Sequence, residues 1–273
     1  MVLLVFLCVA VAVAALYIWL AEAVVWKALL VFVGAFIAVH VVYFTIAALV
    51  TLLVDRSKPI AKQNPLCRAY VKSATGLLMS YCGVRAHVTG EELLPESGRF
   101  VLVSNHRSGF DPLVALNRFH KYGIGFISKP ANMALPLVGP IAYGAGCLAI
   151  DRENDRNALK TILQAASYLK NDVCSIGIYP EGTRSRSGEL LPFHAGSFKI
   201  PQKANVPLVV SCVRESEHIT KNIMRRKTDV YIDILEAIPA ETVRTMTTHE
   251  LSDHARALIE QRLTETATQG GAA

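Results

Sequence analysis

The sequence predicts an α/β domain, built as a mixed β-sheet flanked by helices and preceded by an N-terminal transmembrane helical hairpin. Hydrophobic residues make up 52% of the 273-residue chain and charged residues 18%, a composition too apolar for an ordinary soluble or disordered protein. Only two charged residues, Glu22 and Lys27, fall within residues 1–54. Beyond residue 57, short β-rich runs alternate with helical stretches, which is typical of a sheet covered by helices.

Two uncharged runs form the predicted hairpin. Residues 1–20 and 28–54 are each long enough to cross a hydrocarbon core of about 30 Å, which takes roughly 20 helical residues. The break between them contains both charges and a tryptophan, whose side chain suits the membrane interface. One span with an interfacial helix is a second interpretation, and a cleaved leader is a third. We expect residues 1–56 to be a two-helix membrane anchor, with His40 as a polar residue between packed helices.

Charge around the second run predicts its orientation. Five basic residues crowd its end, namely Arg56, Lys58, Lys62, Arg68 and Lys72. The positive-inside rule then places the following domain in the cytoplasm, which makes the protein an integral protein of the cytoplasmic membrane. This cluster attracts anionic lipid headgroups or forms a solvated linker, and the sequence leaves both interpretations open.

The six cysteines form no C-x-x-C pair, so we expect reduced core residues and no zinc site.

The soluble part is predicted as a helical connector, an α/β domain and a tail. The connector covers residues 57–98, the domain residues 99–265 and the flexible tail residues 266–273. Strands are expected at residues 99–104, 125–128, 147–151, 174–179, 208–214 and 229–235. Apolar residues at helical spacing predict helices over residues 154–169 and 248–264.

A first candidate site follows the strand that ends near residue 104. His106 comes directly after this strand, and a turn containing glycine leads to Asp111-Pro112, which is typical of the start of a helix. Five residues apart across a turn, the imidazole and the carboxylate can face each other. A carboxylate bonded to one ring nitrogen leaves the other nitrogen free to act as a base. Asp111 could equally be a simple helix cap, and the spacing alone leaves both interpretations open.

A second candidate site follows the strand at residues 174–179. Pro180-Glu181-Gly182 forces a turn, and two arginines, a threonine and two serines then crowd into residues 183–187. Arginine offers a planar fork of donors that matches phosphate oxygens, and nearby hydroxyls and turn amides add further donors. This composition favours a substrate that carries a phosphate, although an exposed basic loop would show the same pattern. The segment is no P-loop, because the glycine spacing and the lysine are missing.

Together these segments resemble the glycerophospholipid acyltransferase family, the membrane enzymes that acylate glycerol 3-phosphate or lysophosphatidic acid. The family's N-H-x-x-x-x-D motif is met by Asn105, His106 and Asp111. Its F-P-E-G-T-R-S motif is met by residues 180–185, with Tyr179 in place of the usual phenylalanine. Within the family, the bacterial 1-acylglycerol-3-phosphate acyltransferase type matches best.

Two further family motifs are present. The apolar V-P-L-V run at residues 206–209 matches the fourth motif. A looser second motif is met by Lys129, by a proline and a glycine downstream, and by the pair Asp151-Arg152. Residues 130–132 lack the acidic residue that the family usually has there. The resemblance covers about residues 80–215.

The resemblance implies a glycerol-3-phosphate acyltransferase-like fold and a role for each motif residue. His106 would act as the base and Asp111 would orient it, which makes these two the catalytic residues. The substrate-binding residues would be Lys129, Arg152, Glu181, Gly182, Thr183 and Arg184. Arg184 would hold the acceptor's phosphate with Lys129 as its partner, Glu181 would set the loop, and Arg152 would be a phosphate ligand or a structural ion pair. No metal or cofactor is expected, since the acyl donor is a thioester of coenzyme A or of acyl carrier protein.

The expected reaction transfers a fatty acyl group to the free sn-2 hydroxyl of lysophosphatidic acid and gives phosphatidic acid. One alternative keeps the chemistry with another lysophospholipid or an acylated amino-acid lipid as acceptor. A second alternative is a non-catalytic membrane protein that binds anionic lipid. The basic patch Lys221, Arg225, Arg226 and Lys227 could dock acyl carrier protein or the bilayer surface, or be a solvated loop. Nucleic acid is disfavoured as a partner, because the patch lacks interleaved aromatic residues.

Overall fold

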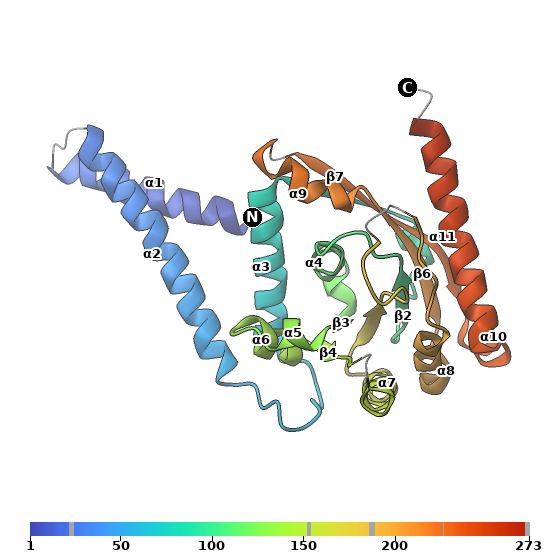
Figure 1. Ribbon diagram of the computed structural model, residues 1–273. Helices are drawn as coiled ribbons and strands as arrows, with labels where there is room; N and C mark the ends of the chain where they lie inside the picture. The colour runs from blue at the N-terminus through green and yellow to red at the C-terminus, as the bar shows by residue number, and fades with distance from the viewer. Residues whose placement is uncertain (22–24, 152–153, 186–188, 226, 271–273) are drawn as a thin grey trace.

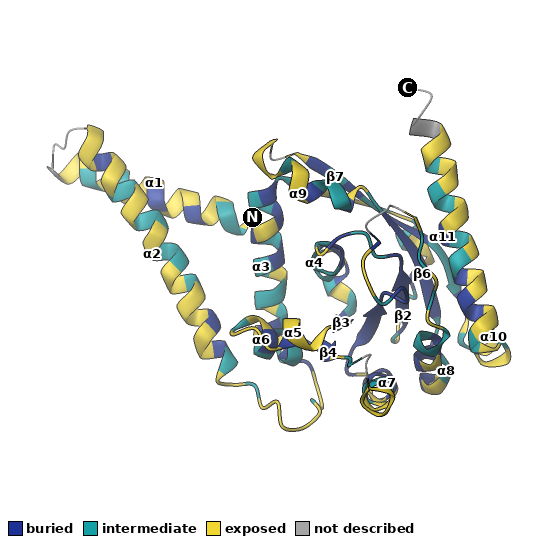
Figure 2. Ribbon diagram, in the orientation of Figure 1, coloured by how far each residue is buried: buried dark blue, intermediate teal, exposed yellow. Residues whose placement is uncertain are grey.

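A helical hairpin extends from an α/β domain in the computed structural model (Figure 1). The structure describes residues 1–21, 25–151, 154–185, 189–225 and 227–270. The hairpin consists of α1 (Val2–Ala21) and α2 (Val25–Thr51). Both helices have the length and the apolar composition of membrane spans. Most of their side chains are exposed and apolar (Figure 2), which suits a lipid surrounding better than water.

The hairpin contacts the domain through α3 (Pro65–Cys82). His40 of α2 bonds the backbone oxygen of Phe36 through Nδ1 at 2.8 Å and the Tyr81 hydroxyl of α3 through Nε2. One turn along α2, the Tyr43 hydroxyl lies 2.8 Å from Ser73 Oγ of α3. His40 therefore lies between packed helices, as expected.

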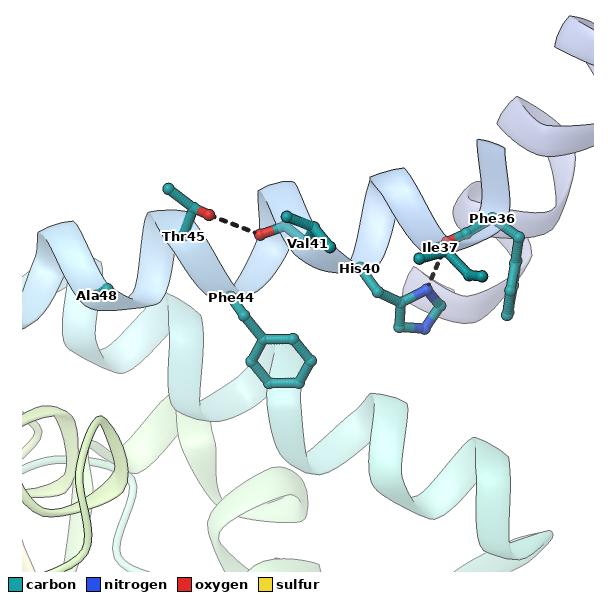
Figure 3. Close-up of a pocket in the computed structure, with 7 residues that line it drawn as sticks. All are labelled: Phe36, Ile37, His40, Val41, Phe44, Thr45 and Ala48. Carbon is teal, nitrogen blue, oxygen red and sulfur yellow. Dashed lines mark hydrogen bonds between the residues drawn. The ribbon is translucent and has the colours of Figure 1, made fainter. Parts of the chain in front are cut away.

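An apolar groove with a volume of about 550 Å³ runs along α2. Figure 3 shows the side chains that line it, with His40 among them. Its lining is Phe36, Ile37, His40, Val41, Phe44, Thr45 and Ala48. Apart from the imidazole and one hydroxyl, this lining offers no polar side chain. The groove therefore fits lipid acyl chains better than a polar ligand.

The segment between hairpin and domain contains a strand that the sequence analysis missed. Asn64 caps the start of α3, and its Oδ1 accepts from the backbone N–H of Leu66 at 2.9 Å. The helix ends at Gly83, whose φ of 65° lies in the left-handed region that glycine adopts without strain. Strand β1 (Val84–Thr89) follows at once, and among the described strands it pairs with β7 alone. Its alternately exposed residues mark an edge strand, which carries a weaker hydrophobic signal than a buried one.

The sheet has seven strands in the order β1-β7-β6-β2-β5-β3-β4. The six expected strands are all present, as β2 (Val101–Ser104), β3 (Ile124–Ser128), β4 (Leu148–Ala149), β5 (Ser175–Ile178), β6 (Leu208–Arg214) and β7 (Thr228–Ile238). Strands β6 and β7 are antiparallel, and every other neighbouring pair is parallel. The mixed sheet expected from the sequence is confirmed.

Helices cover both faces of the sheet (Figure 1). One face packs against α7 (Asp155–Lys170), α8 (Lys199–Ala204), α10 (Ala240–Thr245) and α11 (Thr248–Gly270). The other packs against α3, α4 (Asp111–Arg118) and α9 (Ile219–Asn222), and the short helices α5 (Pro130–Met133) and α6 (Val138–Gly144) lie beside β3 and β4. Val101 and Val103 face the first layer while Phe100 and Leu102 face the second, so β2 is buried on both sides.

Two other expectations concerned the C-terminal segment and the cysteines. Helix α11 continues to Gly270 through most of the segment expected to be a tail, and residues 271–273 lie outside the described residues. All six cysteines are described and none forms a disulfide. Five of them are buried as expected, whereas Cys8 is exposed on α1.

A buried carboxylate on β7 links this strand to its two neighbours, β1 and β6, and to α11. Asp233 of β7 is 2% exposed and accepts hydrogen bonds from Thr89 of β1 at 2.7 Å, Arg214 of β6 at 2.9 Å and Arg262 of α11 at 3.0 Å. Burial of Asp233 opposes its charge, but the bonds from Arg262, Thr89 and Arg214 outweigh burial and lower the pKa of the carboxyl group.

We expect Asp233→Asn to lower the free energy of unfolding by about 3 kcal/mol at pH 7, because two arginines lose their carboxylate partner. A depressed folded-state pKa stabilises the protein above the unfolded value of about 3.9, and this contribution is lost as the pH falls below it. The difference in Tm between wild type and variant should therefore narrow below about pH 4. Asp229→Asn, on the same strand but one third exposed at its side chain, is the matched control and should change Tm little. Equal Tm losses for both variants would contradict the role of Asp233.

Candidate active site

The candidate site lies where three neighbouring parallel strands end. Strands β2, β5 and β3 lie side by side, and their carboxyl ends meet at one edge of the sheet. His106 follows β2, Glu181 follows β5 and Lys129 follows β3. Residues at this edge of a parallel sheet converge on a shared crevice, which is where α/β proteins place their ligands.

The imidazole and the carboxylate of the first motif face each other. His106 Nδ1 lies 2.9 Å from Asp111 Oδ2, and the Asp111 side chain is fully buried at the first residue of α4. Because a carboxylate only accepts, Nδ1 carries the proton and Nε2 is left as the basic nitrogen. The same Oδ2 atom accepts from the backbone N–H groups of Arg107 at 2.7 Å and Ser108 at 2.8 Å. Asp111 therefore orients the imidazole and holds the turn at once.

Two further side chains fix the loop that carries His106. Asn105 donates to the backbone oxygen of Val213 at 2.9 Å and accepts from its N–H at 2.7 Å, which pins the loop to β6. Glu181 accepts the N–H of His106 at 2.6 Å through Oε1 and the N–H of Leu191 at 3.1 Å through Oε2. Both carboxylate oxygens of Glu181 are thus used within the protein. Glu181 is 4% exposed, and its burial raises the pKa of its carboxyl group.

The arginine loop lies against the histidine loop. The backbone N–H of Ser185 donates to the His106 oxygen at 2.9 Å. A methyl group placed on Gly109 would lie 3.4 Å from the Arg184 guanidinium, so this cation reaches the turn between His106 and Asp111. Arg184 is exposed and forms no ion pair with any described residue. Such a cation beside the turn that carries His106 is suited to an anionic group on a substrate.

The other expected binding residues lie partly beside Arg184, partly at the end of β3 and partly outside the described residues. Gly182 has a φ of 71° and makes the turn, and Thr183 is exposed beside Arg184. Lys129 is exposed at the end of β3, two strands from β2, which corresponds to about 10 Å across the sheet. Arg152 lies outside the described residues, as does Arg226 of the basic patch, whereas Lys221, Arg225 and Lys227 are exposed. Within the described chain, no group of three side chains could hold a metal ion.

Sequence reasoning missed one contact of the histidine loop. The Arg107 guanidinium bonds the carboxylate of Glu217, which lies in a single 3-10 turn (Ser216–His218) after β6. The two residues are 110 positions apart, and neither occupies a fixed position of a recognised motif. Only the parallel pairing of β2 with β6 brings their loops together.

Comparisons with known proteins place the chain among acyltransferases. The Acyltransferase family model matches residues 85–214, which include both loops. The 1-acyl-sn-glycerol-3-phosphate acyltransferase of Salmonella typhimurium is 30% identical over 168 residues, which are 62% of this chain and 68% of the relative. The Escherichia coli enzyme of the same name is 31% identical over 169 residues with the same coverage.

A solved structure shares the fold. The chain resembles the crystal structure of the 1-acyl-sn-glycerophosphate acyltransferase of Thermotoga maritima with a TM-score of 0.63 and 20% sequence identity. The match covers 82% of this chain and 88% of that one. The fold and the family model define an acyltransferase, and two N-terminal helices have the length and apolar composition of membrane spans. By its sequence relatives, the chain belongs to the 1-acyl-sn-glycerol-3-phosphate acyltransferase family.

The substitution Glu181→Gln tests how the loop is held. We expect a loss of about 1–3 kcal/mol in the free energy of unfolding, because the amide turns one acceptor into a donor that faces a backbone N–H. Turnover should fall as well, since the His106 backbone is one of the two groups bonded. Thermal unfolding and acyl transfer of the purified variant measure both effects. Glu241→Gln, on the exposed start of α10, is the control, and a Glu181→Gln protein as stable and active as this control would contradict the prediction.

Proposed function

We propose that the protein transfers a fatty acyl group from an acyl thioester to the free sn-2 hydroxyl of lysophosphatidic acid, giving phosphatidic acid. The observation that carries this proposal is the bond between His106 and the buried Asp111, beside an Arg184 guanidinium that forms no ion pair with the described residues. An imidazole with one free nitrogen can activate a hydroxyl, and a neighbouring cation can hold the phosphate of the same molecule. Family membership supports this choice of acceptor.

In the proposed reaction, the acceptor's hydroxyl is the nucleophile. His106 Nε2 removes its proton as the oxygen attacks the thioester carbonyl, which forms a carbon–oxygen bond and a tetrahedral oxyanion. The oxyanion collapses, the carbon–sulfur bond breaks, and the thiolate takes the proton back from the imidazolium. Asp111 keeps the proton on Nδ1 and stabilises the transient imidazolium. This sequence of steps needs no metal or cofactor, because a thiol is a good leaving group.

Arg184 positions the acceptor in this proposal. Its guanidinium offers two parallel donors to the phosphate, and the exposed Thr183 hydroxyl can add a third. Lys129, exposed at the end of β3, is proposed to bind phosphate as the partner of Arg184, and Arg152 is proposed as a further phosphate ligand from the family motif alone. Holding the phosphate brings the glycerol hydroxyl to the imidazole, which converts an encounter between two molecules into a reaction within one complex.

The hairpin is proposed to anchor the domain to the cytoplasmic face of the membrane, where the acceptor lipid resides. The five basic residues that follow or lie near the end of α2 support this orientation. The acyl donor is proposed to be a thioester, formed with either coenzyme A or acyl carrier protein. Assays of both donors with one acceptor separate these two possibilities.

Replacement of the catalytic pair tests the chemistry. His106→Ala should lower kcat by about 10³-fold or more, because the attacking hydroxyl loses its base. Asp111→Asn should lower kcat by a comparable factor, since an amide can stabilise the wrong tautomer of the imidazole. The measurement is transfer of a labelled acyl group to lysophosphatidic acid by purified protein. His249→Ala, an exposed histidine on α11, is the control and should retain full activity. Substantial turnover by His106→Ala would rule out this mechanism.

Replacement of the cation tests the acceptor. Arg184→Ala should raise the KM for lysophosphatidic acid by about 10- to 100-fold, because a charge-assisted bidentate contact to phosphate is lost. The KM for an acceptor without a terminal phosphate should change little. Arg244→Ala, on the exposed surface of α10, is the control. A wild-type protein that prefers acceptors without a terminal phosphate would instead favour another lysolipid as the substrate.

A further inference from the structure

The imidazole of His106 lies at the end of a stack of three aromatic rings. It faces the phenol ring of Tyr179, with centroids 4.3 Å apart and planes inclined by 17°. Tyr179 stacks in turn on Phe126, with centroids 5.5 Å apart and planes inclined by 20°. Because β5 lies between β2 and β3, Tyr179 is the middle ring.

The sheet itself produces this stack. Neighbouring strands are about 4.8 Å apart, which is close to the spacing of stacked rings, so aromatic side chains at the ends of adjacent strands can lie face to face. Phe126 lies opposite Gly177 in the register of β3 and β5. A Cβ atom at Gly177 would overlap the Phe126 ring. The absence of a side chain at Gly177 therefore lets Phe126 lie over β5 and contact Tyr179.

We propose that Tyr179 is a positioning residue for acyl transfer, whose ring fixes the plane of the His106 imidazole so that Nε2 points at the acceptor's hydroxyl. This inference rests on the proposed role of His106 as the base. The bond to Asp111 holds the imidazole at Nδ1 but still allows the ring to tilt about that contact. The stack removes this freedom, and the electron-rich face of the phenol also stabilises the imidazolium formed during the reaction.

The ring of Tyr179 performs this task, and its hydroxyl group does not. Within the described part of the chain, no hydrogen bond to the phenol oxygen is found. Burial, together with the nearby Asp111 carboxylate, raises the pKa of the phenol well above its usual value, so the group stays neutral. The family's usual phenylalanine at this position supplies the same ring.

Two substitutions separate the ring from the hydroxyl. Tyr179→Phe keeps the stack and should retain kcat within about twofold. Tyr179→Leu removes the stack and should lower kcat by about 10- to 100-fold with KM for both substrates little changed, because a misplaced base affects the chemical step. Phe100→Leu is the matched control, since it also removes a buried ring from the same apolar layer, at the opposite end of β2. Its activity per folded molecule should stay at the wild-type level.

A second measurement does not depend on activity. Protein labelled with ¹³C in histidine and held in detergent micelles should show the His106 ring protons shifted upfield by the Tyr179 ring, with His106→Gln identifying the signal. The shift should persist in Tyr179→Phe and disappear in Tyr179→Leu.

The outcomes distinguish this inference from the proposed function. A folded Tyr179→Leu protein with wild-type kcat, or a Tyr179→Phe protein as slow as Tyr179→Leu, would overturn the positioning role. A wild-type protein that transfers no acyl group to any acceptor, yet shows the upfield shift, would overturn the proposed function while leaving the stack in place.

Discussion

The fully buried carboxylate of Asp111 is the constraint on which the rest of the site depends. Removing an ionised carboxylate from water is unfavourable unless donors replace the lost solvent. Here one oxygen accepts from His106 Nδ1 and from the backbone N–H groups of Arg107 and Ser108. The bonds that compensate for burial are the bonds that fold the turn. The same hydrogen bonds therefore stabilise the turn and orient the imidazole. A substitution that exposes Asp111 to water would weaken both the turn and the orientation of the His106 ring.

The parallel sheet brings the loop that carries Arg184 next to the turn that carries His106. Because β2 and β5 are parallel neighbours, the loops after them leave the same edge, and Glu181 ties one loop to the backbone of the other. This brings the Arg184 guanidinium next to the turn between His106 and Asp111. Helix α3 lies between this domain and the hairpin, with Tyr43 and His40 of α2 bonded to its surface. The site is thus built on a rigid sheet that is itself attached to the apolar hairpin.

Much of this arrangement could be predicted from the sequence, because its signals are local. The runs that became β2 and β5 are mostly apolar. The polar residues that follow them had to lie at a shared edge, because the two strands are parallel neighbours. Contacts between distant segments carried no such signal. The pairing of Arg107 with Glu217 and the stacking of Phe126 on Tyr179 depend on which strands are neighbours, which the spacing of motifs does not reveal. Strand β1 was missed because an edge strand with one exposed face has a weak pattern, and α11 ran further than its apolar period predicted.

A structure of the protein with lysophosphatidic acid bound, in the absence of a donor, tests the central claim most directly. The account predicts the phosphate within hydrogen-bond distance of the Arg184 guanidinium, and the free glycerol hydroxyl within such a distance of His106 Nε2. A phosphate held elsewhere on the domain, with the hydroxyl remote from the imidazole, would contradict it.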